Sequence, residues 1–303
     1  MTTATVSARE AYRVELTELA ADDSRIVCLE ADLGGASHCF RDRFPDRFLN
    51  LGIAEASAVD IAVGLASAGL RPFVNTFASF AAFRAGESVK LGLGYLAAPV
   101  VLVSPYGGVS GAWFGPTHHC LEDLAVMQSL PGVRIAVPAG EAETREAIRV
   151  AAAGDWPCYV RLGRNEVFDA SFAPAGRGAV TWLNQISGDT CLVSIGEKPT
   201  ALCQAVTESR PDVGHAHLCW VDAESLALAI PHLAGARRVV VVEEHRPAGS
   251  VASTLALLLP DREVRGVNAG TDWPTEGGNH DETLAAMGLT TSAVLNAVLE
   301  GEK

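Results

Sequence analysis

The sequence predicts an α/β protein made of two three-layer domains, each with a mostly parallel sheet. Short apolar runs rich in β-branched residues alternate with segments of helical periodicity along the 303 residues, as expected for crossover units around a parallel sheet. Hydrophobic residues make up 49% of the chain and charged residues 19%, which is enough apolar material for two cores and too much for a mainly disordered protein.

The first domain is expected over residues 1–165. Its predicted strands are short apolar runs, at residues 25–30, 72–76, 99–104, 133–138 and 158–162. Its predicted helices alternate with these strands, at residues 6–21, 54–68, 81–92, 121–130 and 141–153. The periodicity is then lost over residues 166–187, where Asn, Asp, Pro and Gly indicate a linker.

The second domain is expected over residues 188–303. Its predicted strands lie at residues 190–195, 215–221, 238–243 and 263–267. Its predicted helices lie at residues 200–208, 250–258 and 280–299. The order again favours a parallel sheet that is covered by helices on both faces.

Charge and cysteine content narrow the function class. The chain has 23 basic and 36 acidic residues, a net charge of −13, and no Lys/Arg cluster of the kind that binds nucleic acid. No apolar run reaches the ~18 residues of a membrane-spanning helix, and the N-terminus lacks the pattern of a signal peptide. Seven scattered cysteines without a CxxC pair indicate reduced thiols. We therefore expect a cytoplasmic protein that acts neither on nucleic acid nor in a membrane.

A glycine-rich loop over residues 106–119 (YGGVSGAWFGPTHH) follows a predicted strand. Loops at the carboxyl ends of parallel strands are where open α/β sheets bind ligands, so we expect a functional loop. Its last residues begin a group of metal-ligand types, namely His118, His119, Cys120, Glu122 and Asp123. Zinc sites need further ligands at reachable spacing, and none is evident, so we predict no metal ligands in this chain.

Two other features have both a structural and a functional interpretation. Glu55 begins the small-residue helix 54–68, where an acid also stabilises the helix dipole. Phe77, Phe80 and Phe83 recur every third residue, which brings them to one side of a helical turn and is also typical of a core stripe. Spacing alone leaves both alternatives open.

Read in order, a series of segments resembles the C-terminal half of transketolases, which consists of a pyrimidine-binding domain and a C-terminal domain. The segments follow the family's order and spacing over most of the chain: Asp32-Leu33, Arg47–Glu55, Gly64–Gly69, Pro72–Phe80, Gly115–His119, Glu122-Asp123, Val137–Ala139, Tyr159–Arg164 and Glu243–His245. The resemblance is specific because it rests on many motifs, although it leaves the role of His245 open.

The resemblance implies a binding site for thiamine diphosphate. The family glutamate that shares a proton with N1′ of the cofactor's aminopyrimidine corresponds to Glu55, a catalytic residue. The aromatic pocket for the pyrimidine corresponds to Phe77, Phe80 and Phe83, with Phe80 as the stacking face. By the same correspondence, Asp32-Leu33 lies near the cofactor, at the end of the first strand.

The resemblance also implies a substrate site. The catalytic His118 would hydrogen-bond the reacting hydroxyl and carbonyl region of the donor, and Arg161 would face its anionic end. Two substrate-facing positions differ from the family, because Tyr106 stands where the family has a histidine and Phe114 where it has an aspartate. These differences predict a preference for substrates other than ordinary sugar phosphates.

The family's diphosphate and Mg²⁺ site is a GDG motif followed by an asparagine, and the chain contains no GDG. The resemblance therefore implies the smaller subunit of a split transketolase, active with a GDG-bearing N-terminal subunit in an α2β2 heterotetramer. Such an enzyme transfers a two-carbon ketol unit from a ketose-type donor to an aldehyde or other acceptor. Two alternatives are a 2-oxo acid dehydrogenase β-like or acyloin synthase subunit, and a non-catalytic regulatory homologue.

Overall fold

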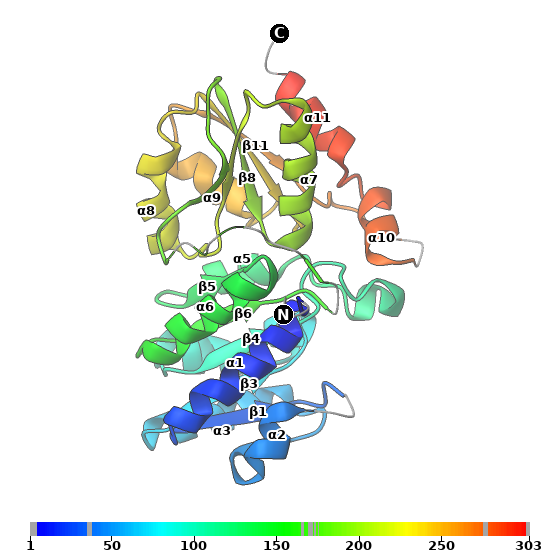
Figure 1. The fold of residues 1–303 in the computed structure, drawn as a ribbon. Helices are drawn as coiled ribbons and strands as arrows, with labels where there is room; N and C mark the ends of the chain where they lie inside the picture. The colour runs from blue at the N-terminus through cyan, green and yellow to red at the C-terminus, as the bar shows by residue number, and fades with distance from the viewer. Residues whose placement is uncertain are drawn as a thin grey trace.

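The computed structural model describes residues 5–34, 38–164, 167–168, 172, 174, 176–274 and 278–300. The chain forms two α/β domains, which are stacked one above the other in Figure 1. One sheet is built from residues before the predicted linker, and the other belongs to the C-terminal part of the chain. The fold confirms the predicted class, two sheets that are entirely or largely parallel.

The first sheet has six parallel strands in the order β2-β1-β3-β4-β6-β5. The strands are β1 (Ile26–Glu30), β2 (Phe48–Asn50), β3 (Arg71–Asn75), β4 (Val101–Ser104), β5 (Arg134–Ala136) and β6 (Cys158–Arg161). The helices are α1 (Ala8–Asp22), α2 (Cys39–Arg43), α3 (Glu55–Ser67), α4 (Gly86–Val89), α5 (Asp123–Gln128) and α6 (Gly140–Ala153).

Helices cover both faces of this sheet, so every residue of its central strands β1, β3, β4 and β6 is buried. Alternate residues of β1 point to opposite faces: Ile26 and Cys28 pack with α1 and α6, while Val27 and Leu29 pack with α3. Glu55 begins α3 and is thereby fixed against the sheet.

The second sheet has five strands in the order β11-β10-β8-β9-β7, parallel except for β7 beside β9. Its strands are β7 (Thr181–Asn184), β8 (Thr190–Ile195), β9 (Gly214–His217), β10 (Arg238–Glu243) and β11 (Glu263–Val267). Its helices are α7 (Glu197–Ser209), α8 (Ala223–Leu233), α9 (Val251–Leu258), α10 (His280–Ala286) and α11 (Thr291–Leu299). Helices α8 and α9 share a core with one face, and α7 and α11 with the other.

Several elements differ from the sequence prediction. Strand β7 lies inside the range 166–187 expected as a linker, part of which falls outside the described residues. Helix α8 was not predicted. The helix expected at 81–92 is interrupted: π-helical turns at Phe80–Arg84 and Lys90–Tyr95 flank α4. Such wide turns are frequent at functional sites.

The helix expected at 280–299 is also divided. Residues His280–Leu299 have the length and mean hydropathy, 1.2, of a membrane-spanning helix. They form α10 and α11 instead, separated at Gly288, whose φ of +80° ends the first helix. Val294 and Val298 of α11 are buried in the core of the second domain.

The two domains are joined by backbone and side-chain contacts. Val137 donates to the carbonyl of Cys219 at 2.7 Å, which links the end of β5 to the chain after β9. His245 is fully buried, and its Nε2 accepts from the amide of Ala125 at the start of α5. Its Nδ1–H then donates to the carbonyl of Arg246 at 2.8 Å. His245 therefore lies in the joint between the domains.

Candidate active site

The carboxyl ends of the first sheet's strands bring three predicted site residues, and one arginine that was not predicted, to one edge. Asp32 follows β1, Phe77 follows β3, Tyr106 follows β4, and Arg164 lies just beyond β6. These four strands are neighbours in the order β1-β3-β4-β6, so the residues that follow them lie along one edge of the sheet, where open α/β sheets bind ligands.

Glu55 combines burial with incomplete hydrogen bonding. As the first residue of α3 it is only 2% exposed, and the positive end of the helix dipole stabilises its charge. Its Oε1 accepts from Nη1 of Arg84 at 2.6 Å, whereas its buried Oε2 has no hydrogen-bond partner among the residues that the structure describes. Buried carboxylate oxygens are normally paired, so the free Oε2 is an acceptor suited to an N–H group of a ligand.

An aromatic cluster lies beside this carboxylate. Phe77 and Phe80 meet edge to face at 5.8 Å, and His118 contacts both rings at 5.4 and 5.3 Å. Phe83, predicted as a third member, is not in this ring cluster; it is 61% exposed. The structure therefore assembles Phe77 and Phe80 with His118, and it places Phe83 further out.

A groove of about 570 Å³ opens next to the cluster. It is lined by residues of the π-helical turn, of the glycine-rich loop and of the second domain: Ser79, Phe80, Phe83, Arg84, Pro116, Thr117, His119, Glu122 and Trp273. Two of the three predicted aromatic residues, Phe80 and Phe83, therefore border the same space as Arg84, the partner of Glu55.

The glycine-rich loop presents His118 to the cluster. Gly115 has φ +71° and ψ −164°, a conformation that is essentially restricted to glycine. His118 Nδ1 lies 2.9 Å from the hydroxyl of Thr117, and the ring of Phe114 stacks on the imidazole at 4.7 Å. Burial, together with the charge of Arg84, lowers the pKa of His118. The imidazole is therefore neutral at physiological pH.

The loop residues that resemble metal ligands are otherwise engaged. His119 is buried with its Nε2 3.1 Å from the carbonyl of Ala112, and Asp123 accepts from Tyr159 and Arg161. Within the part of the chain that the structure describes, no three His, Cys, Asp or Glu side chains are grouped so that they could hold a metal ion.

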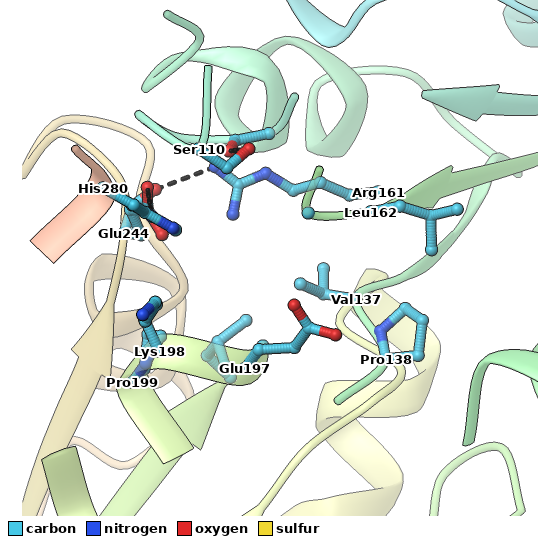
Figure 2. Close-up of a pocket in the computed structure, with 14 residues that line it drawn as sticks. Ser110, Val137, Pro138, Arg161, Leu162, Glu197, Lys198, Pro199, Glu244 and His280 are labelled. Carbon is cyan, nitrogen blue, oxygen red and sulfur yellow. Dashed lines mark hydrogen bonds and ion pairs between the residues drawn. The ribbon is translucent and has the colours of Figure 1, made fainter. Parts of the chain in front are cut away.

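Arg161 is buried, and its guanidinium is hydrogen-bonded within the protein. It is 5% exposed, and its Nε donates to Asp123 at 2.8 Å while Nη2 donates to the carbonyls of Cys120 and Glu244. Figure 2 shows it beside a small cavity of about 30 Å³ between the domains. Asp123 balances the charge of Arg161, which links the loop to the second domain through the carbonyls of Cys120 and Glu244. The expected contact of Arg161 with the substrate stays a prediction.

Two arginines that were not predicted as site residues, Arg164 and Arg9, are hydrogen-bonded to the predicted site residues Tyr106 and Leu33. Arg164 donates from Nε to the hydroxyl of Tyr106 at 2.5 Å, and its guanidinium covers the ring of Trp113 at 3.6 Å. Arg9 donates to the carbonyl of Leu33 at 3.1 Å, and its buried Nε has no partner. Burial and the nearby charges of Arg13 and Arg164 lower the pKa of Arg9. Guanidinium groups whose charges act on each other in this way favour an anionic ligand.

The remaining predicted residues lie at the same edge. Asp32 is exposed, with φ +45°, and Leu33 is 8% exposed. Tyr106 is buried with φ +67°, and its ring contacts Phe77 at 4.5 Å. Of the two arginines that were not predicted, only Arg164 lies in a segment that resembles the family, Tyr159–Arg164. The sequence could therefore have indicated Arg164 but not Arg9.

Comparison with known proteins defines the class of this domain first. The transketolase pyrimidine-binding domain family matches residues 4–168. The chain is 30% identical to an apulose-4-phosphate transketolase subunit of Phocaeicola vulgatus, over 97% of each protein. The chain therefore belongs to the transketolase family, which confirms the resemblance inferred from its motifs.

The likeness extends across both domains. A solved structure described as a split gene transketolase, inactive β4 tetramer, has a TM-score of 0.84 and 31% identity, with 98% of each chain covered. The 1-deoxy-D-xylulose-5-phosphate synthase of Nitratidesulfovibrio vulgaris is 31% identical over 94% of this chain. The chain spans 46% of that longer enzyme, and it corresponds to the pyrimidine-binding half of the family.

Proposed function

We propose that this chain is the pyrimidine-binding subunit of a two-chain, thiamine diphosphate-dependent transketolase. The enzyme would transfer a two-carbon ketol unit from a ketose-type donor to an aldehyde or other acceptor, as a transferase of class EC 2.2.1. One observation carries the proposal: the buried Glu55 has an Oε2 without a partner among the described residues, and Arg84, which binds its Oε1, lies over the ring of Phe80. Relatives described as transketolase subunits support it.

The residues present fit the cofactor's aminopyrimidine. Glu55 offers a buried acceptor for a ring N–H and can hold the proton at Oε2, while Phe80, supported by Phe77, offers an aromatic face. When bound, thiamine diphosphate supplies the electron sink for cleavage and formation of the carbon–carbon bond. Mg²⁺ and the diphosphate would be held by the GDG-bearing partner, since this chain has no GDG.

The substrate residues follow from the same edge. Neutral His118 can donate to a carbonyl or accept from a hydroxyl of the donor, next to the face of Phe80. Arg164, oriented by Tyr106, would bind an anionic group together with Arg9. Phe114 covers one face of His118 and offers no acceptor to a substrate hydroxyl.

The partner would dock on the outer face of α3. Ile61 and Gly64 are exposed there, and no atom lies within 4 Å of a Cβ built on Gly64. A small-residue face of this kind permits close approach of another helix. We propose an α2β2 assembly in the cytoplasm, with the cofactor site completed at this interface.

Co-expression with a GDG-bearing protein encoded beside this chain tests the proposal. The purified complex is assayed with ketose donors and 2-oxo acid donors, and the products are identified by mass spectrometry. We expect ketol transfer from a ketose, and a loss of about 10²–10⁴-fold in turnover for Glu55→Gln with folding and assembly intact. Turnover of 2-oxo acids alone would indicate the dehydrogenase-like alternative, and a Glu55→Gln enzyme retaining more than about a third of the activity would exclude acid–base catalysis by Glu55.

A further inference from the structure

We infer that Arg84 occupies the place of the cofactor's aminopyrimidine in the free chain and has to swing out before the cofactor binds. The inference rests on the proposed function, because it concerns the same pocket. It assigns to Arg84 an inhibitory contact that keeps the pocket closed until the cofactor arrives.

Arg84 makes the two contacts expected of the aminopyrimidine. Its Nη1 donates to Oε1 of Glu55 at 2.6 Å, as a ring N–H of the ligand would donate to this carboxylate. Its guanidinium carbon lies 3.9 Å from the centroid of the Phe80 ring, the face on which the pyrimidine would stack. A guanidinium is planar, delocalised and rich in N–H donors, so it imitates an aminopyrimidine in shape and hydrogen bonding.

The two occupants exclude each other. One face of Phe80 accepts one planar group at van der Waals distance, and Arg84 already covers a face of that ring. Phe77 and His118 contact other parts of the Phe80 ring, at centroid distances of 5.8 and 5.3 Å. A pyrimidine stacked between this carboxylate and ring therefore displaces the guanidinium.

Arg84 is placed so that it can leave. It is the last residue of the π-helical turn Phe80–Arg84, and its side chain is 46% exposed beside the open groove. Among the described residues, Glu55 is the one acceptor recorded for its guanidinium. Swinging into the groove returns the cation to water and requires no change in the sheet or in α3.

The same contact explains how the free chain tolerates a buried carboxylate at this position. An unpaired buried charge is strongly unfavourable, and Arg84 supplies the counter-charge while the ligand is absent. Ligand affinity falls in proportion to the fraction of molecules whose pocket is open. Removal of Arg84 should therefore tighten binding of the cofactor, by about tenfold or about 1.4 kcal/mol.

Isothermal titration of thiamine diphosphate, at fixed Mg²⁺, into the complex of this chain with its GDG-bearing partner tests the inference. We expect Arg84→Met to bind about tenfold more tightly than wild type. Arg84→Lys should lie between the two, because lysine restores the charge but not the planar face. Lys90→Met is the matched control, since it removes one exposed positive charge six residues further along the chain, and it should bind like wild type.

If the wild-type complex binds thiamine diphosphate and the Arg84→Met complex binds it equally or more weakly, the inference is wrong. The proposed function is unaffected by that result. Failure of every variant, wild type included, to bind thiamine diphosphate would overturn both. A second readout uses the isolated chain: melting temperatures of Arg84→Met, Glu55→Gln and the double variant. Their effects should be non-additive because the residues are in contact, and strictly additive effects would contradict the pairing of Arg84 with Glu55.

Discussion

Two residues, Glu55 and His118, have side-chain atoms placed so that they can act on a ligand. Glu55 keeps one carboxylate oxygen without a partner among the described residues. His118 contacts Phe77 and Phe80, and burial and the charge of Arg84 lower its pKa. Motif order was sufficient to predict both residues, because Glu55 lies in the segment Arg47–Glu55 and His118 in the segment Gly115–His119. The pairing of Glu55 with Arg84 was not predictable, because it joins residues 29 positions apart on different elements.

Phe114 is expected to restrict the substrates. A site that offers a hydrogen bond to a substrate hydroxyl discriminates strongly, and here an aromatic ring stacked on His118 takes the place of such an acceptor. We predict weak activity on xylulose 5-phosphate and ribose 5-phosphate, with kcat/KM below the ordinary range of about 10⁴–10⁸ M⁻¹s⁻¹. Steady-state assays of the two-subunit enzyme measure this directly.

The variant Phe114→Asp should gain sugar-phosphate activity because it restores a hydroxyl acceptor beside His118. Leu96→Asp is the control, since it introduces the same charge at an exposed apolar residue on another segment. Ordinary sugar-phosphate turnover by the wild-type enzyme would show that Phe114 does not set the specificity.

Elements were predictable from sequence where apolar periodicity is strong. The buried strands β1, β3, β4, β6, β8 and β10 and helices α1, α3 and α6 follow directly from it, because each is covered on one or both faces. Strand β7 was missed because it pairs only at the sheet edge, in a segment without clear apolar periodicity. The π-helical turns carry no distinctive composition, and only tertiary packing selects them over α-helix.

The conformation of the glycine-rich loop depends on Gly115. At φ +71° and ψ −164° a side chain is strained by about 1–3 kcal/mol, although no atom lies within 4 Å of a Cβ at this position. We predict that Gly115→Ala lowers the unfolding free energy by that amount and displaces His118, which reduces turnover. Urea denaturation of the isolated chain and assays of the complex measure the two effects.

Gly64→Ala provides the comparison, because Gly64 is helical and surrounded by open space in the free chain. It should raise the stability of the isolated chain by up to about 1 kcal/mol. A Gly115→Ala protein as stable and as active as wild type would contradict the role given to this glycine.

Strand β9 contains a histidine that ties stability to pH. His215 is fully buried, its Nε2 lies 2.9 Å from Ser194 Oγ, and burial, with the charge of His217 second, lowers its pKa to about 3. An unfolded histidine titrates near 6.5, so the unfolded chain binds an extra proton below that pH. Stability is therefore complete above about pH 6.5 and falls as the pH approaches 3.

Between pH 7 and pH 5 we expect His215 to contribute a loss of roughly 2 kcal/mol in unfolding free energy. The variant His215→Gln keeps an acceptor for Ser194 and should flatten this slope, whereas His232→Gln, at an exposed position, should not. Denaturant titrations at a series of pH values check it, and parallel slopes for wild type and His215→Gln would contradict the assignment.

The whole molecule positions its site by stacking two domains. The motifs predicted a substrate contact for Arg161 and no role for His245. In the structure both residues lie between the domains, where they connect the second domain to the glycine-rich loop and to α5. Sequence order could not separate Arg161 from Arg164, because only the fold shows that the chain leaves the sheet between them. The position of the site at the carboxyl edge of the first sheet was predictable, because the carboxyl ends of parallel strands lie at the same edge.

The division of the cofactor site between this chain and a partner is tested most directly by titration of thiamine diphosphate into three samples. These are the isolated chain, its complex with the GDG-bearing subunit and Mg²⁺, and the same complex in EDTA. We predict tight binding, with a Kd in the range of about 1 µM or below, only in the complex with Mg²⁺. Tight, Mg²⁺-dependent binding by the isolated chain would contradict the divided site.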